Sequence, residues 1–154
     1  MAETPRLRTL RQAIAYFSNR DRCLELAVRM RWRNGVACPT CGSQQVTFLS
    51  TRQLWKCKQQ HPQQQFSVKV GTIFEDSPIG LDKWFGAIWM VANHPEEVTA
   101  LDLARDLQVS QKTAAHMIHR IQLAMNTGTF EKIAYRKDRS SRARIFALDS
   151  DCQR

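Results

Sequence analysis

The sequence predicts an α+β chain in which helical segments lie on both sides of a small three-stranded module. Apolar residues recur at helical spacing in the first thirty residues and again beyond residue 80. Short runs between these segments alternate as strands do, and several cysteines lie at the turns between the runs. The 154 residues, 43% of them hydrophobic, suffice for one ordinary domain or two very small ones.

Residues 1–34 are predicted to form a helical N-terminal segment. The cluster SNRD is typical of a helix cap, and DRCLELAVRMRW predicts a second helix after the first one over residues 9–17. Cys23 has no cysteine or histidine at ligand spacing, so we expect it in the core or on a helix face. The apolar stripe of the first helix is formed by Leu10, Ala13, Ile14 and Phe17.

Residues 35–77 are predicted to form a hairpin-rich module. The pair Asn34-Gly35 ends the second helix, and the runs VTFLS, QLWKC and FSVKVGTIF predict three short strands. In the third run, Phe66, Val68 and Val70 alternate with polar residues. Such a module is too small to have a large core of its own.

The cysteine spacing in this module predicts a metal site. Two residues separate Cys38 from Cys41, fifteen separate Cys41 from Cys57, and three separate Cys57 from His61. The first pair suits one tight turn, and the longer interval is what two short strands need to return to the same point. Zinc accepts imidazole nitrogen as readily as sulfur in a closed tetrahedral site. We therefore predict a zinc ribbon with one structural Zn²⁺ held by Cys38, Cys41, Cys57 and His61.

Two alternatives remain open for this site. The cysteines could be free thiols, with His61 as an ordinary surface residue. Cys152 is the only cysteine that could replace His61 as the fourth ligand.

Residues 78–127 are predicted to form paired helices behind a buried helix, LDKWFGAIWMVA. Thr99 and Asp102 fit a capping box that opens a short helix. The three-residue turn QVS follows, and Ser110 caps a further helix from Gln111. A short capped helix, a tight turn and a second helix form the helix-turn-helix pattern.

In helix-turn-helix proteins, the N-terminal residues of the second helix lie near base edges in the major groove. Glutamine can pair with adenine, and Lys and Arg with guanine or phosphate. A plain helical hairpin with a solvated face is the alternative, which the near-neutral charge of residues 81–127 favours. The residues that we expect to contact DNA are Gln111, Lys112, Thr113, His116 and Arg120.

The net charge of +9 indicates a polyanionic partner, nucleic acid before a membrane surface, because no amphipathic basic helix is evident. Residues 1–80 carry twelve Lys/Arg against five Asp/Glu, and residues 128–154 carry seven against four. The latter are predicted to be a basic, poorly ordered tail. No apolar run approaches the ~18 residues of a membrane span, and the N-terminus lacks an apolar signal core, so we expect a cytoplasmic protein.

Three segments together resemble the N-terminal part of bacterial zinc-ribbon insertion-sequence transposases: CPTCGS, WKCKQQHPQQQFSVKVGTIFEDSPIGLDKW and LARDLQVSQKTAAHMIHRIQLAM. The resemblance extends from about Thr9 to Phe130. It implies the same four zinc ligands, although that family more often has cysteine at the position of His61. It also implies a DNA-reading helix from Gln111, with double-stranded DNA at transposon ends as the partner and a full-length transposase as a second candidate partner. The expected location is the bacterial cytoplasm, at the nucleoid.

In that family the DNA-binding part precedes a ribonuclease-H-like domain whose acidic triad binds two divalent metals. Here the sequence after TGTFEK turns basic, and Asp149 and Asp151 lack the large sheet that two-metal chemistry requires. We therefore expect a chain that recognises transposon ends and is not an enzyme, either a truncated or frame-shifted transposase or a regulator. The alternative from a different class is a zinc-ribbon adaptor that binds RNA or protein.

Overall fold

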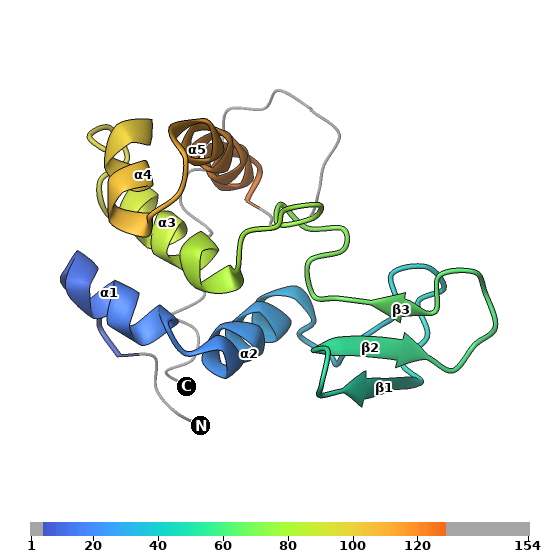
Figure 1. The fold of residues 1–154 in the computed structure, drawn as a ribbon. Helices are drawn as coiled ribbons and strands as arrows, with labels where there is room; N and C mark the ends of the chain where they lie inside the picture. Colours follow the sequence, from blue (N-terminus) through green and yellow to red (C-terminus); the bar gives the residue numbers. More distant parts are fainter. Residues whose placement is uncertain (1–4, 129–154) are drawn as a thin grey trace.

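A computed structural model describes residues 5–128, which form five helices and one three-stranded sheet. Figure 1 shows most of the helices gathered at one end of the molecule and the sheet at the other. The predicted α+β class and the three strands are confirmed. In chain order the elements are α1 (Leu10–Phe17), α2 (Arg20–Arg31), β1 (Val46–Leu49), β2 (Leu54–Cys57), β3 (Gln65–Phe66), α3 (Leu81–Asn93), α4 (Ala100–Leu107) and α5 (Gln111–Thr127).

Four of the five helices begin at a polar side chain that accepts a hydrogen bond from the first helical turn. Thr99 accepts from the amide of Asp102, whose carboxylate accepts in turn from the amide of Thr99. This is the capping box that the sequence predicts. The four N-cap residues are Thr9, Asn19, Thr99 and Ser110. Local sequence therefore decides where these helices begin.

Helix α3 is the centre of the helical end. The sequence predicts one buried face, but all eight residues from Trp84 to Val91 are buried. Burial extends beyond the predicted face because four helices, α1, α2, α4 and α5, each pack against α3. A Cβ atom on Gly86 would lie 3.0 Å from Cδ2 of Leu107, so a glycine permits the close approach of α4. The N-terminal helices and the paired helices thus share one core.

The sheet is antiparallel with strand order β1-β2-β3. Phe48, Trp55 and Phe66 lie opposite one another across the three strands and share one face. Trp32, which follows α2, packs on this face with its ring centroid 5.6 Å from that of Trp55 and 6.1 Å from that of Phe66. Aromatic packing therefore joins the sheet to the helical end.

The third strand is much shorter than predicted. Of the run FSVKVGTIF, only Phe66 lies in a strand, and the chain from Val68 onward forms turns apart from a single β-bridge at Thr72. Thr72 donates its hydroxyl to the carbonyl oxygen of Lys69 at 2.6 Å, and Gly71 has a φ of +77°, which ends an extended strand. Beyond Phe66, the alternation in this run therefore reflects burial in a turn-rich segment rather than a continuous strand.

Two further expectations concern the C-terminal tail and membrane-spanning helices. The predicted tail over residues 128–154, with Cys152 and both late aspartates, lies outside the described residues except for Gly128. Among the helices that the structure does describe, none has the length and apolar character needed to cross a membrane.

Candidate zinc centre and nucleic-acid surface

The four predicted ligands come from two turns beside the sheet. Cys38 and Cys41 lie in the loop before β1, Cys57 is the last residue of β2, and His61 lies in the loop that follows. The amide of Gly42 donates to the carbonyl oxygen of Cys38 at 2.8 Å and closes the first turn. Gly42 has a φ of +73°, a conformation that favours glycine. The local sequence thus forms the knuckle that brings the first two sulfurs together.

The ligand atoms of these four residues all lie within 4.8 Å of one another. Sγ of Cys41 is 3.6 Å from Sγ of Cys57, and Sγ of Cys38 is 3.5 Å from Nε2 of His61. A tetrahedral zinc with Zn–S bonds of about 2.3 Å and Zn–N bonds of about 2.0 Å separates two sulfurs by about 3.8 Å, and a sulfur from a nitrogen by about 3.5 Å. The spacing fits this geometry.

The surroundings of Cys38 favour the thiolate that zinc requires. Burial by itself would raise the pKa of this thiol. The N–H groups of Cys41 and Thr40, together with the neighbouring Cys41 and Cys57 side chains, outweigh burial and lower that pKa from 9.0 to about 7. A thiolate at Cys38 is therefore available near neutral pH.

Cys57 differs from Cys38 in this respect. Burial raises the pKa of its thiol, the amide of Gln59 lowers it, and the sulfurs of Cys41 and Cys38 raise it further. The net direction is upward, first because burial disfavours the charged thiolate and further because the neighbouring sulfurs favour the protonated thiol. A cation is needed to hold all three sulfurs as thiolates.

His61 presents Nε2 to the site, while its Nδ1 is buried without a hydrogen-bond partner among the described residues. Four nitrogen and sulfur ligands leave no open position for water or substrate, which is typical of a structural zinc. The predicted cofactor is confirmed: the site fits one structural Zn²⁺.

Cys23 takes no part in this centre, as predicted. Its thiol is buried in the helical core and donates to the carbonyl oxygen of Phe17 at 3.1 Å. Burial, with a smaller contribution from Asp82 that exceeds the opposing effect of Arg22, raises the pKa of this thiol to about 11. Cys23 is a protonated core residue at neutral pH.

The five residues predicted to contact DNA all lie on α5, but their surroundings differ. Gln111, Lys112 and His116 are exposed. Thr113 is half-buried, and its hydroxyl accepts a hydrogen bond from Ser110 at 2.8 Å. Arg120 is also half-buried and is bonded to backbone carbonyls outside the helix. DNA contact at these positions stays a prediction.

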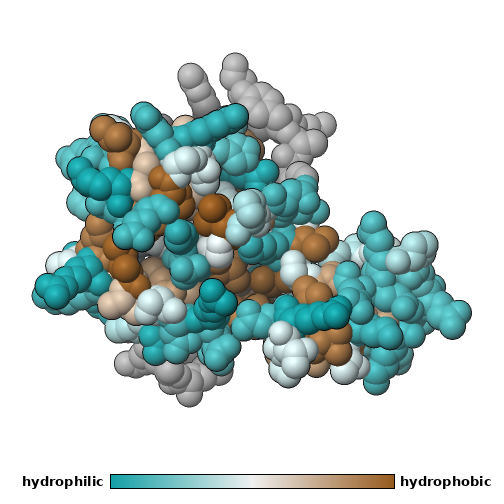
Figure 2. Space-filling model, in the orientation of Figure 1, coloured by the Kyte–Doolittle hydropathy of each residue, from teal (hydrophilic) through white to brown (hydrophobic). Residues whose placement is uncertain are grey.

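Sequence reasoning missed a strongly basic stretch around the ribbon. From Leu26 to Phe74 the chain contains seven Lys/Arg and no Asp/Glu, a signal that charge counts over long windows average away. Figure 2 shows that the sheet end of the molecule is mostly hydrophilic on the face drawn. The five exposed cations of this stretch are Arg29, Arg33, Arg52, Lys56 and Lys58.

Comparison with known proteins places this region in a family. The family described as the transposase zinc-ribbon domain matches residues 18–59, a range that includes α2 and three of the four ligands. An uncharacterized protein in transposable element ISH50 of Halobacterium salinarum is 30% identical over 116 residues, which are 73% of this chain and 38% of that protein. The chain thus spans well under half the length of that relative. No solved structure matches.

The resemblance to insertion-sequence transposases is confirmed by both findings. The metal geometry agrees with the family match. Three of the four clustered ligands, Cys38, Cys41 and Cys57, lie within the matched range. Residues 18–59 therefore match the transposase zinc-ribbon domain, and the chain is similar to a protein of an insertion-sequence element.

Proposed function

We propose that residues 5–128 bind double-stranded DNA as the DNA-binding part of a transposition protein. The observation that carries this proposal is the stretch from Leu26 to Phe74, in which five cations are exposed and no Asp or Glu occurs. Phosphate contacts by such cations release counterions and supply sequence-independent affinity. One zinc with three thiolates adds about one negative charge and leaves the stretch strongly basic.

We assign sequence reading at the transposon ends to α5. Helices α4 and α5 pack together and are joined by the three residues Gln108–Ser110. Gln111 and Lys112 are exposed in the first turn of α5 and His116 in the second, and α5 contains no Asp or Glu. These properties suit the second helix of a helix-turn-helix, whose N-terminal residues lie in the major groove.

We further propose that this chain occupies DNA ends without cutting them, and so competes with a full-length transposase. Among residues 5–128, the zinc ligands are the only group of three or more metal-binding side chains close enough to share an ion. Strand transfer needs carboxylates that hold two metals at about 3.5–4 Å. A closed zinc site supplies no such chemistry.

An RNA-binding adaptor is the second candidate, and one observation favours it. Phe48 is 45% exposed on the sheet, with its ring centroid 5.0 Å from that of Trp55. Exposed aromatic rings among cations are typical of surfaces that stack unpaired bases.

Competition on one labelled duplex separates the two candidates. Unlabelled duplex DNA should displace the protein at lower concentrations than single-stranded RNA of equal length. The reverse order, together with weaker RNA binding by Phe48→Ala, would favour the adaptor.

Groove reading has its own test. Gln111→Ala should cost about 1–3 kcal/mol on DNA that carries the ends of the insertion sequence and less on random DNA. Equal losses on both would contradict base reading by α5. Plasmid carrying those ends should stay intact with Mg²⁺ or Mn²⁺, and metal-dependent nicking would contradict the non-catalytic assignment.

A further inference from the structure

The chain between β3 and α3, Ser67–Gly80, is held by cationic side chains rather than by regular secondary structure; we call it the connecting segment. It has no long strand or helix, yet five of its carbonyl oxygens accept hydrogen bonds from three basic residues. Arg31 Nη1 donates to Val68 at 2.9 Å, Lys69 Nζ to Ser77 at 3.1 Å and to Ile79 at 2.6 Å, and Arg120 Nη1 to Ile73 and to Glu75, both at 2.8 Å.

These bonds fix the connecting segment against two helices, α2 and α5, and other contacts fix it against α3. Arg31 lies at the end of α2 and Arg120 in the middle of α5. On the side of α3, the ring of Phe74 packs on Trp84 with centroids 5.2 Å apart, and Trp84 Nε1 donates to the Ser77 hydroxyl at 3.1 Å. Hydrogen bonds from charged donors are about twice as strong as neutral ones, so the segment is firmly held despite its irregular backbone.

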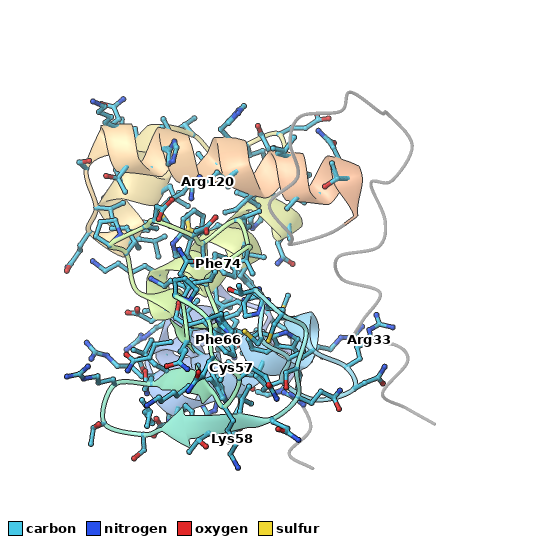
Figure 3. All side chains as sticks on the ribbon, turned by 90° about the vertical axis from the view of Figure 1, so that its right-hand side faces the viewer. Arg33, Cys57, Lys58, Phe66, Phe74 and Arg120 are labelled. Atoms are coloured by element: carbon cyan, nitrogen blue, oxygen red, sulfur yellow. The ribbon has the colours of Figure 1, made fainter. Side chains whose placement is uncertain are left out.

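The position of Arg120 distinguishes it from the exposed cations of the molecule. Its side chain is half-buried, and one nitrogen of its guanidinium serves both carbonyls. Figure 3 shows Arg120 on α5, with Phe74 of the connecting segment below it and Phe66 and Cys57 of the ribbon below that. Arg120 therefore joins α5 to the chain that leaves the zinc ribbon.

We propose that Arg120 is a positioning residue that fixes α5 relative to the ribbon, so that both contact one DNA duplex as a rigid unit. This proposal rests on the proposed function. Two linked contacts can bind about 10²–10⁴ times more tightly than either alone, but only if their geometry lets both engage at once. Arg120 holds that geometry.

The test compares Arg120→Met with Arg105→Met on two random-sequence duplexes. Methionine keeps an apolar stem and removes the donors. Arg105→Met removes the same charge from an exposed position on α4, where Arg105 pairs with Asp102 and Asp106, both of them outside the connecting segment. One duplex has about one helical turn, roughly 10 base pairs, and the other about three turns.

We expect wild type to bind the long duplex more tightly than its extra length alone explains. Arg120→Met should lose roughly tenfold or more on the long duplex and little on the short one, because only the long duplex reaches both surfaces. Arg105→Met should keep the length dependence of wild type. Arg120→Lys is a milder second variant that keeps the charge, so a loss confined to the long duplex would come from position.

A different pattern would overturn the proposal. If Arg120 contacts phosphate instead, Arg120→Met should lose the same factor on both duplexes, and the slope of log affinity against log salt should become shallower by about 0.9.

Hydrogen exchange without DNA separates this proposal from the proposed function. The amides of Glu75 and Ser77, which donate to Thr72 and Phe74, should exchange faster in Arg120→Met than in Arg105→Met. Suppose that the wild-type protein binds neither duplex but that these amides still exchange faster in Arg120→Met. That result would overturn the proposed function and leave the positioning role of Arg120 standing. Unchanged exchange would overturn the positioning role whatever the DNA result.

Discussion

His61 supplies the one nitrogen in a site of three sulfurs, so its removal should weaken zinc binding and leave the thiolates in place. Apparent zinc-binding free energies of about 10–16 kcal/mol are shared among four ligands, so His61→Ala should lower zinc affinity by roughly two orders of magnitude. Competition with a chromophoric chelator measures this change. Cys23→Ser, outside the site, should keep the affinity of wild type, and full retention by His61→Ala would remove His61 from the site.

Cys23 should make the fold sensitive to alkaline pH. Its thiol has a pKa of about 11 in the folded protein and 9.0 as its ordinary value. A folded-state pKa above the unfolded value means that folding holds the proton, so the stabilisation is complete below pH 9 and is lost as pH rises toward 11. Thermal unfolding of wild type and Cys23→Ala between pH 8 and 11 measures this loss, because other titrating groups cancel in the difference. Parallel curves for the two proteins would contradict the assignment.

Among the helices, α5 should depend on its cap. Ser110 accepts a hydrogen bond from the amide of Thr113 at 3.1 Å. Ser110→Ala should therefore lower the free energy of unfolding by about 1 kcal/mol. Denaturant titration measures the change, and exposed Ser50, in the turn between β1 and β2, provides the control substitution to alanine. A loss no larger than that of the control would show that packing alone fixes the start of α5.

The helix starts could be predicted from the sequence because their physical cause is local. A cap such as Thr99 and its partner Asp102 are three residues apart, so the sequence displays both. Burial of Gly86 and Ala87 in α3 has a distant cause, since it depends on which helices cover them. The same is true of Val70, whose strand-like alternation arises in a turn.

At the scale of the whole molecule, spacing predicted which four residues bind zinc, while contacts over long sequence separations could not be predicted. The bond from Arg120 to Ile73 spans 47 residues, and nothing near either residue signals it. Without that signal, the place of Arg120 on a polar helix face suggested contact with DNA. In the structure, Arg120 Nη1 donates hydrogen bonds to two carbonyl oxygens of the connecting segment.

The two ends of the molecule should respond differently to removal of zinc. The helical end has its own core around α3, whereas the ribbon has few buried side chains and depends on the metal for its fold. Chelation should therefore leave most helical circular dichroism intact. Chelation should also end the fixed arrangement of the cations Arg52, Lys56 and Lys58, because the folded ribbon holds them in place.

DNA affinity should fall with chelation, and the salt slope should become shallower by about 0.9 for each ribbon cation that no longer reaches a phosphate. Titrating one duplex at several salt concentrations, before chelation, after it and after zinc is restored, measures both quantities. Cys57→Ser should behave like the chelated protein even with zinc present, because a buried ligand is missing. If chelation leaves affinity and slope unchanged while the ribbon unfolds, DNA binding belongs to the helical end alone, and the exposed ribbon cations must serve another partner.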